Sequence, residues 1–137
     1  MNHQLNLRIY YKDTDAGGIV YHSNYLEYAE RARTEFLHEI GLSNKALIDR
    51  DIAFIIKRAE IDYKSPARLE DTITVHTRIG EIKNASMVML QTVKRGNTEL
   101  VDLKIMVVFV NPHTLKPVRI PEDLKEKFAG YLPEGEN

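Results

Sequence analysis

The chain has 137 residues, 43% of them hydrophobic and 28% charged, with a net charge of -1 at neutral pH. This predicts a single globular domain over residues 1–137, and the balance of 19 basic and 20 acidic residues argues against nucleic-acid binding. No segment offers the ~20 apolar residues of a membrane helix, and we see no signal-like apolar run. Together with the absence of cysteine, this predicts a cytoplasmic protein without membrane insertion, disulfides or zinc-thiolate sites.

The first predicted elements are a strand and a long helix. Residues 5–9 alternate between apolar and polar, which is typical of a half-buried strand that stops before Asp13. From Asn24 onward, apolar residues recur at steps of three and four, which predicts a helix of four to five turns ended by Gly41. The apolar stripe consists of Tyr25, Tyr28, Ala29, Ala32, Phe36 and Ile40.

The start of this helix carries capping signals. Ser23 or Asn24 is suited to cap it with a side-chain oxygen, and Glu27 stands three residues after Asn24, as in a capping box. Glu27 also stands four residues before Arg31, and this spacing indicates a solvated helix face. A short second helix is predicted over residues 43–49.

The rest of the chain has the pattern of an antiparallel sheet. Four strands are predicted, over residues 54–63, 72–82, 86–95 and 100–110, with a tight hairpin at Arg95-Gly96-Asn97. The run IMVVFV is apolar on both faces, so we expect a cover on both sides of that strand. One helix covers one side, and the second cover is either the segment after Pro121 or, preferably, another subunit. The element order predicts an α+β layer.

Residues 13–24, with the sequence DTDAGGIVYHSN, contain the candidate site. A calcium loop starting at Asp13 would have Gly17 at its fifth position and Asn24 instead of glutamate at its twelfth, so calcium is discarded. The serines lack a nucleophile elbow, the glycine pair lacks dinucleotide-loop spacing, and the histidines lack zinc spacing. Two interpretations remain: acids that cap turns, or a carboxylate that faces a helix start.

A carboxylate opposite a helix start suits acyl transfer. Free N–H groups at the helix start polarise a carbonyl and hold an oxyanion, and one such donor contributes about 3–4 kcal/mol in other enzymes. The carboxylate attacks the carbonyl carbon or activates a water. Thioesters fit this chemistry because their carbonyls are electrophilic and a thiolate leaves without a strong acid. The Gly17-Gly18 pair lets a substrate pass close to the backbone.

These residues also carry a family resemblance. The order Arg8-Ile9, Thr14-Asp15, Gly18-Ile19-Val20, His22 and Tyr25, with its spacing, resembles the signature of the 4-hydroxybenzoyl-CoA thioesterase family. The segments YYKDTDAGGIVYHSNYLEYAERARTEFL and AFIIKRAEIDYKSPARLED are similar, within it, to the Tol-Pal-associated acyl-CoA thioesterases of bacteria. The resemblance extends to about Pro121. It implies a hot-dog fold, in which a five-stranded antiparallel sheet wraps a long central helix.

The resemblance implies roles for individual residues. Asp15 is the catalytic carboxylate, as nucleophile or as general base, and the backbone N–H of His22 helps to polarise the thioester carbonyl. Asp13 is assigned to structure, and the glutamates of the helix have capping or ion-pair explanations. The substrate-binding residues are Gly18, Ile19, Val20, Tyr25, Lys64, Ser65 and Pro66.

The implied function is an acyl-CoA thioesterase that releases the free acid and CoA without metal or cofactor, CoA being part of the substrate. Acyl carrier protein is an alternative donor. The site is expected between the subunits of a homo-oligomer, either a dimer or a dimer of dimers that forms a homotetramer. Two rivals stay open: an acyl-thioester dehydratase or hydratase on the same fold, and a non-catalytic partner of an envelope complex that binds acyl thioesters or acyl carrier protein.

Coenzyme A carries three phosphate groups, so a nearly neutral chain must gather cations locally. Each candidate cation alone is typical of a solvated surface charge, and Lys64 is preferred because it belongs to the family-like segment Tyr63-Lys64-Ser65-Pro66-Ala67. The candidates are Lys57, Arg58, Lys64, Arg68, Lys83, Lys94 and Arg95.

Overall fold

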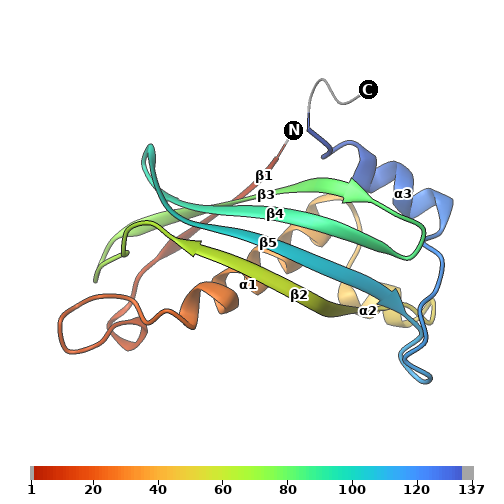
Figure 1. Cartoon of the computed structure of the whole chain (residues 1–137), viewed down its shortest axis with the longest axis horizontal. Coiled ribbons are helices and arrows are strands. Elements are labelled where there is room, and N and C mark those ends of the chain that lie inside the picture. The colour runs from red at the N-terminus through yellow and green to blue at the C-terminus, as the bar shows by residue number, and fades with distance from the viewer. Residues whose placement is uncertain (1, 134–137) are drawn as a thin grey trace.

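One antiparallel sheet of five strands lies against a long helix in the computed structural model, which describes residues 2–133 (Figure 1). The strands stand in the order β1-β3-β4-β5-β2. The sequence predicted a five-stranded antiparallel sheet on one long helix, but it did not predict this strand order. The elements are β1 (His3–Arg8), a 3-10 turn (Tyr11–Asp13), α1 (Asn24–Glu39), α2 (Asn44–Ile48), β2 (Ala53–Tyr63), β3 (Thr72–Ile82), β4 (Ser86–Arg95), β5 (Thr98–Val110) and α3 (Glu122–Ala129).

The long helix α1 buries the predicted stripe against the sheet, and Ala29, Ala32 and Phe36 are fully buried. Its start differs from the prediction. Ser23 occupies the capping position but is already helical in its backbone angles, and it makes no side-chain capping bond. The side chain of Asn24 donates instead to the carbonyl of Asp13 at 2.9 Å. The predicted side-chain caps are therefore wrong, because a capping residue needs an extended backbone.

The two faces of β5 have different surroundings. Ile105, Val107 and Phe109 are buried beneath the helices, whereas Met106 and Val108 on the outer face are only half-buried. Helix α3 packs on the inner face too, because the Phe128 ring lies 6.0 Å from that of Phe109. Of the two covers considered for the second face, the less favoured one, the segment after Pro121, is therefore wrong. That segment extends the cover of the first face.

The two edges of the sheet differ in length and exposure. β1 has six residues, whereas β2 has eleven and is exposed along most of its length. Ile55 and Ile56 on β2 are 39% and 48% exposed. α1 packs on β1 and β3, and the short helix α2 is the helix that contacts β2. Among the described residues, no helix is both long and apolar enough to cross a membrane.

Candidate active site

Asp15 lies at the tip of a tight hairpin closed by a bridge between Thr14 and Val20. Its Oδ1 accepts hydrogen bonds from the backbone N–H of Gly17 at 2.8 Å and of Ile19 at 3.2 Å. Gly18 has a positive φ of 75°, which a side chain would strain. The side chain of Asp15 is exposed, and no donor in residues 2–133 bonds its Oδ2. One carboxylate oxygen is thus fixed and the other is free to react.

Asp13 ties this hairpin to the start of α1. Its carbonyl accepts from the backbone N–H of Tyr21 at 3.2 Å and from the side chain of Asn24 at 2.9 Å. Its carboxylate accepts from the N–H of Tyr10 at 2.8 Å, and the residue is only 7% exposed. These bonds are consistent with the structural role assigned to Asp13. Within residues 2–133, no group of three or more acids and histidines is placed to hold a metal.

The start of α1 presents unpaired backbone donors. The N–H of Asn24 bonds to the carbonyl of Tyr21 at 3.0 Å, and that of Tyr25 to His22 at 3.4 Å. For the N–H groups of His22 and Ser23, the described part of the chain supplies no acceptor. Both groups stand at the positive end of the helix dipole, so they favour an anion or a developing oxyanion.

A cavity of about 340 Å³ opens beside this helix start. It brings together seven of the residues predicted from the sequence, whereas Asp15 and Gly18 are not part of its wall. One further wall residue, Tyr63, is not among the predicted site residues. The wall consists of Ile19, Val20, His22, Tyr25, Tyr63, Lys64, Ser65 and Pro66.

Tyr63 holds the helix start against the end of β2. Its hydroxyl donates to the carbonyl of His22 at 3.2 Å, and its ring lies 4.6 Å from the imidazole and 5.8 Å from the Tyr25 ring. The one sequence signal for it is its place at the start of the family-like segment before Pro66. An aromatic residue at the end of an alternating strand is otherwise interpreted as packing.

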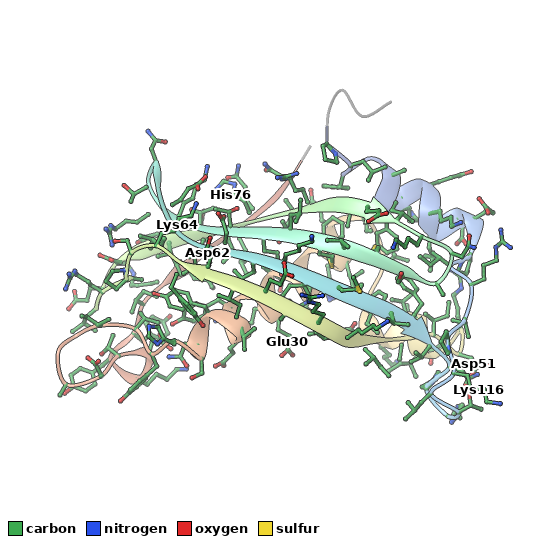
Figure 2. All side chains as sticks on the ribbon, viewed as in Figure 1. Glu30, Asp51, Asp62, Lys64, His76 and Lys116 are labelled. Atoms are coloured by element: carbon green, nitrogen blue, oxygen red, sulfur yellow. The ribbon has the colours of Figure 1, made fainter. Side chains whose placement is uncertain are left out.

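Tyr25 and Lys64 each also interact with residues outside the cavity wall. Tyr25 is 1% exposed, and its hydroxyl accepts from the N–H of Ala67 at 2.9 Å. Burial raises the pKa of Tyr25, so its hydroxyl stays protonated at neutral pH. The Lys64 ammonium lies 2.8 Å from Asp102 and 2.9 Å from Glu99, and these hydrogen bonds raise its pKa. Lys64, labelled in Figure 2, is thus part of the cavity wall while its charge is already matched by two acids.

The other candidate cations fall into two groups. Arg58 pairs with Glu60 at 3.0 Å, and Arg95 pairs with Asp71 at 2.9 Å. Arg68 forms a backbone bridge with Ile19 at the Asp15 hairpin, and its side chain has no ion pair in the described chain. Lys57, Lys83 and Lys94 likewise have none among residues 2–133. Neither these three lysines nor Arg68 are part of the cavity wall, but Arg68 adjoins the Asp15 hairpin through its backbone bridge.

Known proteins similar to this chain are thioesterases. Residues 10–128 match the family model described as the thioesterase-like superfamily. The acyl-CoA thioester hydrolase YbgC of Escherichia coli is 38% identical over 89% of this chain and 92% of the relative. The acyl-CoA thioesterase YbgC of Helicobacter pylori is 34% identical over 89% and 96%. A probable thioesterase from Bartonella henselae has a TM-score of 0.83 at 34% identity, covering 88% of this chain and 100% of that one. These likenesses confirm the predicted α+β hot-dog fold.

Proposed function

The chain belongs to the thioesterase-like superfamily, and we propose that it is an acyl-CoA thioesterase in which Asp15 and the start of helix α1 hydrolyse the thioester. The observation that carries this proposal is the pair of unpaired N–H groups at His22 and Ser23, which open beside the cavity and next to the Asp15 hairpin. The E. coli relative, named an acyl-CoA thioester hydrolase, supports the substrate class.

The reaction needs a polarised carbonyl and a nucleophile. The thioester carbonyl oxygen accepts from the N–H of His22, and the helix dipole stabilises the oxyanion that forms. The free Oδ2 of Asp15 either attacks the carbonyl carbon or removes a proton from an attacking water. In both routes the carbon–sulfur bond breaks and CoA leaves as a thiolate. In the first route a water then cleaves the mixed anhydride between the acyl group and Asp15, which releases the free acid and restores the carboxylate. The fixed Oδ1 keeps the carboxylate oriented, because its two hydrogen bonds come from its own hairpin.

The wall residues bind the rest of the substrate. Ile19 and Val20 pack against the chain next to the thioester, and Gly18 lets it pass close to the backbone. Arg68 is the phosphate ligand that the structure favours, because its charge is not matched by an acid in the described chain and it adjoins the Asp15 hairpin. Lys64, Ser65 and Pro66 close the other side of the cavity.

The direct test is release of free thiol from a panel of acyl-CoAs. Asp15→Asn keeps the shape of the side chain and removes the carboxylate, so we expect kcat to fall at least roughly a hundredfold. Asp15→Ala is the second variant. Asp13→Asn makes the same chemical change at the neighbouring acid, to which we assign a structural role, and is the matched control. An Asp15→Asn protein that keeps full activity contradicts the assignment of Asp15.

The same assay separates the rival functions. A dehydratase or hydratase changes the absorbance of enoyl thioesters without releasing thiol, and a non-catalytic binding protein releases none from any substrate. Acyl carrier protein loaded with the same acyl group tests the alternative donor. A higher kcat/KM with the carrier protein than with CoA would make it the preferred substrate.

We also propose that two copies pair through the open edge of β2. Its eleven residues leave a long row of unpaired backbone groups, which natural proteins usually cover. In an antiparallel pair centred on Arg58, the middle residue of the strand, Tyr63 of one copy lies opposite Ala53 of the partner subunit. Each site then has neighbouring residues from the partner. Light scattering measures this assembly, and a monomer at working concentration contradicts it.

The half-buried outer face supports a second contact that joins dimers into a homotetramer. Val88 and Met106 are neighbours on that face, and Val108 continues the apolar surface. Two such faces bury each other by sheet packing. We place the enzyme in the cytoplasm, where CoA thioesters are made and where a chain without cysteine fits.

A further inference from the structure

A second cavity, of about 330 Å³, lies farther along α1, between that helix, α2 and the edge strand β2. Its volume corresponds to about eleven water molecules, which suits a short or medium acyl group. Most of its wall is apolar, including Leu37, Leu47, Phe54, Met87, Met89 and Val107. In the β2 pair proposed above, Ala53 and Phe54 of the partner subunit lie beside Tyr63, so this cavity adjoins the other copy's reaction centre.

Arg33 is the basic residue of this wall. Its Nη1 donates to Oε1 of Gln91 at 3.0 Å, and burial lowers the pKa of its guanidinium. Among residues 2–133, no carboxylate lies within 4.0 Å of it. A guanidinium has five N–H donors, and a neutral amide oxygen accepts one of them here. Desolvated charges in proteins are normally paired with an opposite charge.

Gln91 orients this guanidinium without neutralising it. The amide is 1% exposed, and its Nε2 donates to the carbonyl of Ala29 at 2.9 Å and to Thr77 Oγ1 at 3.0 Å. Both bonds fix the amide so that its oxygen points to Arg33. Glu30 also contributes to the wall, but it is exposed at the open side of β2, where water screens its charge (Figure 2). Arg33 is half-buried and forms no ion pair with a described residue, while Glu30, the one acid of this wall, raises its pKa through space from an exposed position.

We infer that Arg33 recognises an oxygen acceptor at the far end of the acyl group, most strongly a carboxylate, so that thioesters of dicarboxylic acids are substrates. This inference rests on the proposed thioesterase function and on the β2 pair. A carboxylate accepts two parallel hydrogen bonds from a guanidinium and forms the direct ion pair that Arg33 does not have with a described residue. Without Arg33, burying that carboxylate in an apolar wall is strongly unfavourable.

The test compares adipoyl-CoA with hexanoyl-CoA, which have the same chain length and differ at the terminal carboxylate. We expect the wild type to hydrolyse adipoyl-CoA with a kcat/KM at least equal to that for hexanoyl-CoA. Arg33→Met has an apolar side chain of similar length, and it lowers the adipoyl-to-hexanoyl ratio about 10- to 100-fold. Arg33→Lys keeps the charge and retains part of the preference.

A second variant changes Gln91, the hydrogen-bond partner of Arg33, and leaves Arg33 itself in place. Gln91→Glu places a carboxylate where the amide oxygen now accepts from Arg33 at 3.0 Å, so the protein itself supplies the counter-ion. The adipoyl-to-hexanoyl ratio should fall as in Arg33→Met. Melting curves and light scattering accompany each variant, so that loss of folding or of assembly is recognised.

Three outcomes overturn the inference alone, and a fourth, given last, overturns the proposed function with it. A wild type at least tenfold poorer on adipoyl-CoA contradicts it, as does an unchanged ratio in Arg33→Met. A variant that dissociates the oligomer would show that Arg33 serves the subunit contact instead. If Arg33→Met does not fold, the wild-type ratio and Arg33→Lys decide. In these cases hexanoyl-CoA is still hydrolysed and the proposed function stands. Absence of thiol release from both substrates by the wild type means that the function itself is wrong, and the inference falls with it.

Discussion

The two cavities along α1 differ in the polar groups that they offer to a ligand. At the helix start, the polar groups are backbone N–H donors and a carboxylate held by its own hairpin. At the middle of the helix, the polar group is one side chain, Arg33, oriented by a side chain from β4. In the function that we propose, the reaction chemistry depends on backbone geometry, which sequences with different side chains can share. The preference for an acyl group depends on residues that a single substitution changes.

We expect the largest effect on activity when the backbone donor at the helix start is removed. His22→Pro eliminates one N–H, and we expect kcat to fall about 10²- to 10³-fold, as when one oxyanion donor is lost. His22→Ala keeps the N–H and is the control, with an expected loss below about tenfold. Steady-state thiol release measures both variants. Equal losses would show that the imidazole, and not the backbone, carries the effect.

The second cavity is tested through its orienting amide. Gln91→Leu leaves the carbonyl of Ala29, Thr77 and the Arg33 guanidinium without their partner, so we expect the free energy of unfolding to fall by about 1–3 kcal/mol. Urea denaturation measures the change. Thr92→Val, on the same strand but the outer face, is the matched control and should lose less. A Gln91→Leu protein as stable as the wild type would mean that the network contributes little.

Tyr63→Phe tests the contact between the start of α1 and strand β2, which contributes residues to both cavities. The change removes only the hydroxyl that donates to the carbonyl of His22. We expect kcat to fall about threefold to tenfold, the value of one neutral hydrogen bond, while KM changes less. Tyr21→Phe, at an exposed tyrosine beside His22, is the control. A loss seen only in KM would assign Tyr63 to substrate binding instead of positioning.

The smallest expected effect concerns Lys64. Because Glu99 and Asp102 already hold its ammonium, Lys64→Met should change KM for acyl-CoA by less than about threefold. Arg68→Met, which removes a charge without such partners, should raise KM more, by about threefold to tenfold. A large rise in KM for Lys64→Met alone would restore Lys64 as the phosphate ligand.

Local patterns predicted much of this molecule. The strands Thr72–Ile82 and Ser86–Arg95 and the helix beginning at Asn24 were predicted at their observed bounds or starts, because period-2 and period-3.6 burial are properties of neighbouring residues. Helix α3 was not predicted, since eight residues after a proline give too short a pattern. The side-chain caps of α1 were wrong because Asn24 bonds to Asp13, a contact set by how the hairpin folds back.

In the candidate site, too, local segments could be predicted from the sequence and contacts between distant residues could not. Residues 13–24 and 63–66 are contiguous segments, so a family-like motif can indicate them, although their catalytic roles stay predictions. The pairing of Arg33 with Gln91 joins residues 58 positions apart, and the pairing of Lys64 with Asp102 depends on the register of β2 and β5. No local pattern in one sequence indicates such contacts, because tertiary packing creates them.

The contact between α3 and α1 has a consequence for biosynthesis. Phe128 stacks on Phe36 at 6.2 Å, and Lys127 donates to the carbonyl of Ile40 at 3.1 Å, next to the end of α1. A growing chain leaves the ribosome from its N-terminus, so the segment with Asp15 and His22 emerges early. Its helix gains this last anchor only after residue 128 has been made. The nascent enzyme should therefore stay inactive until residue 128 has left the ribosome, and chains that stop before this residue should be substrates for proteolysis.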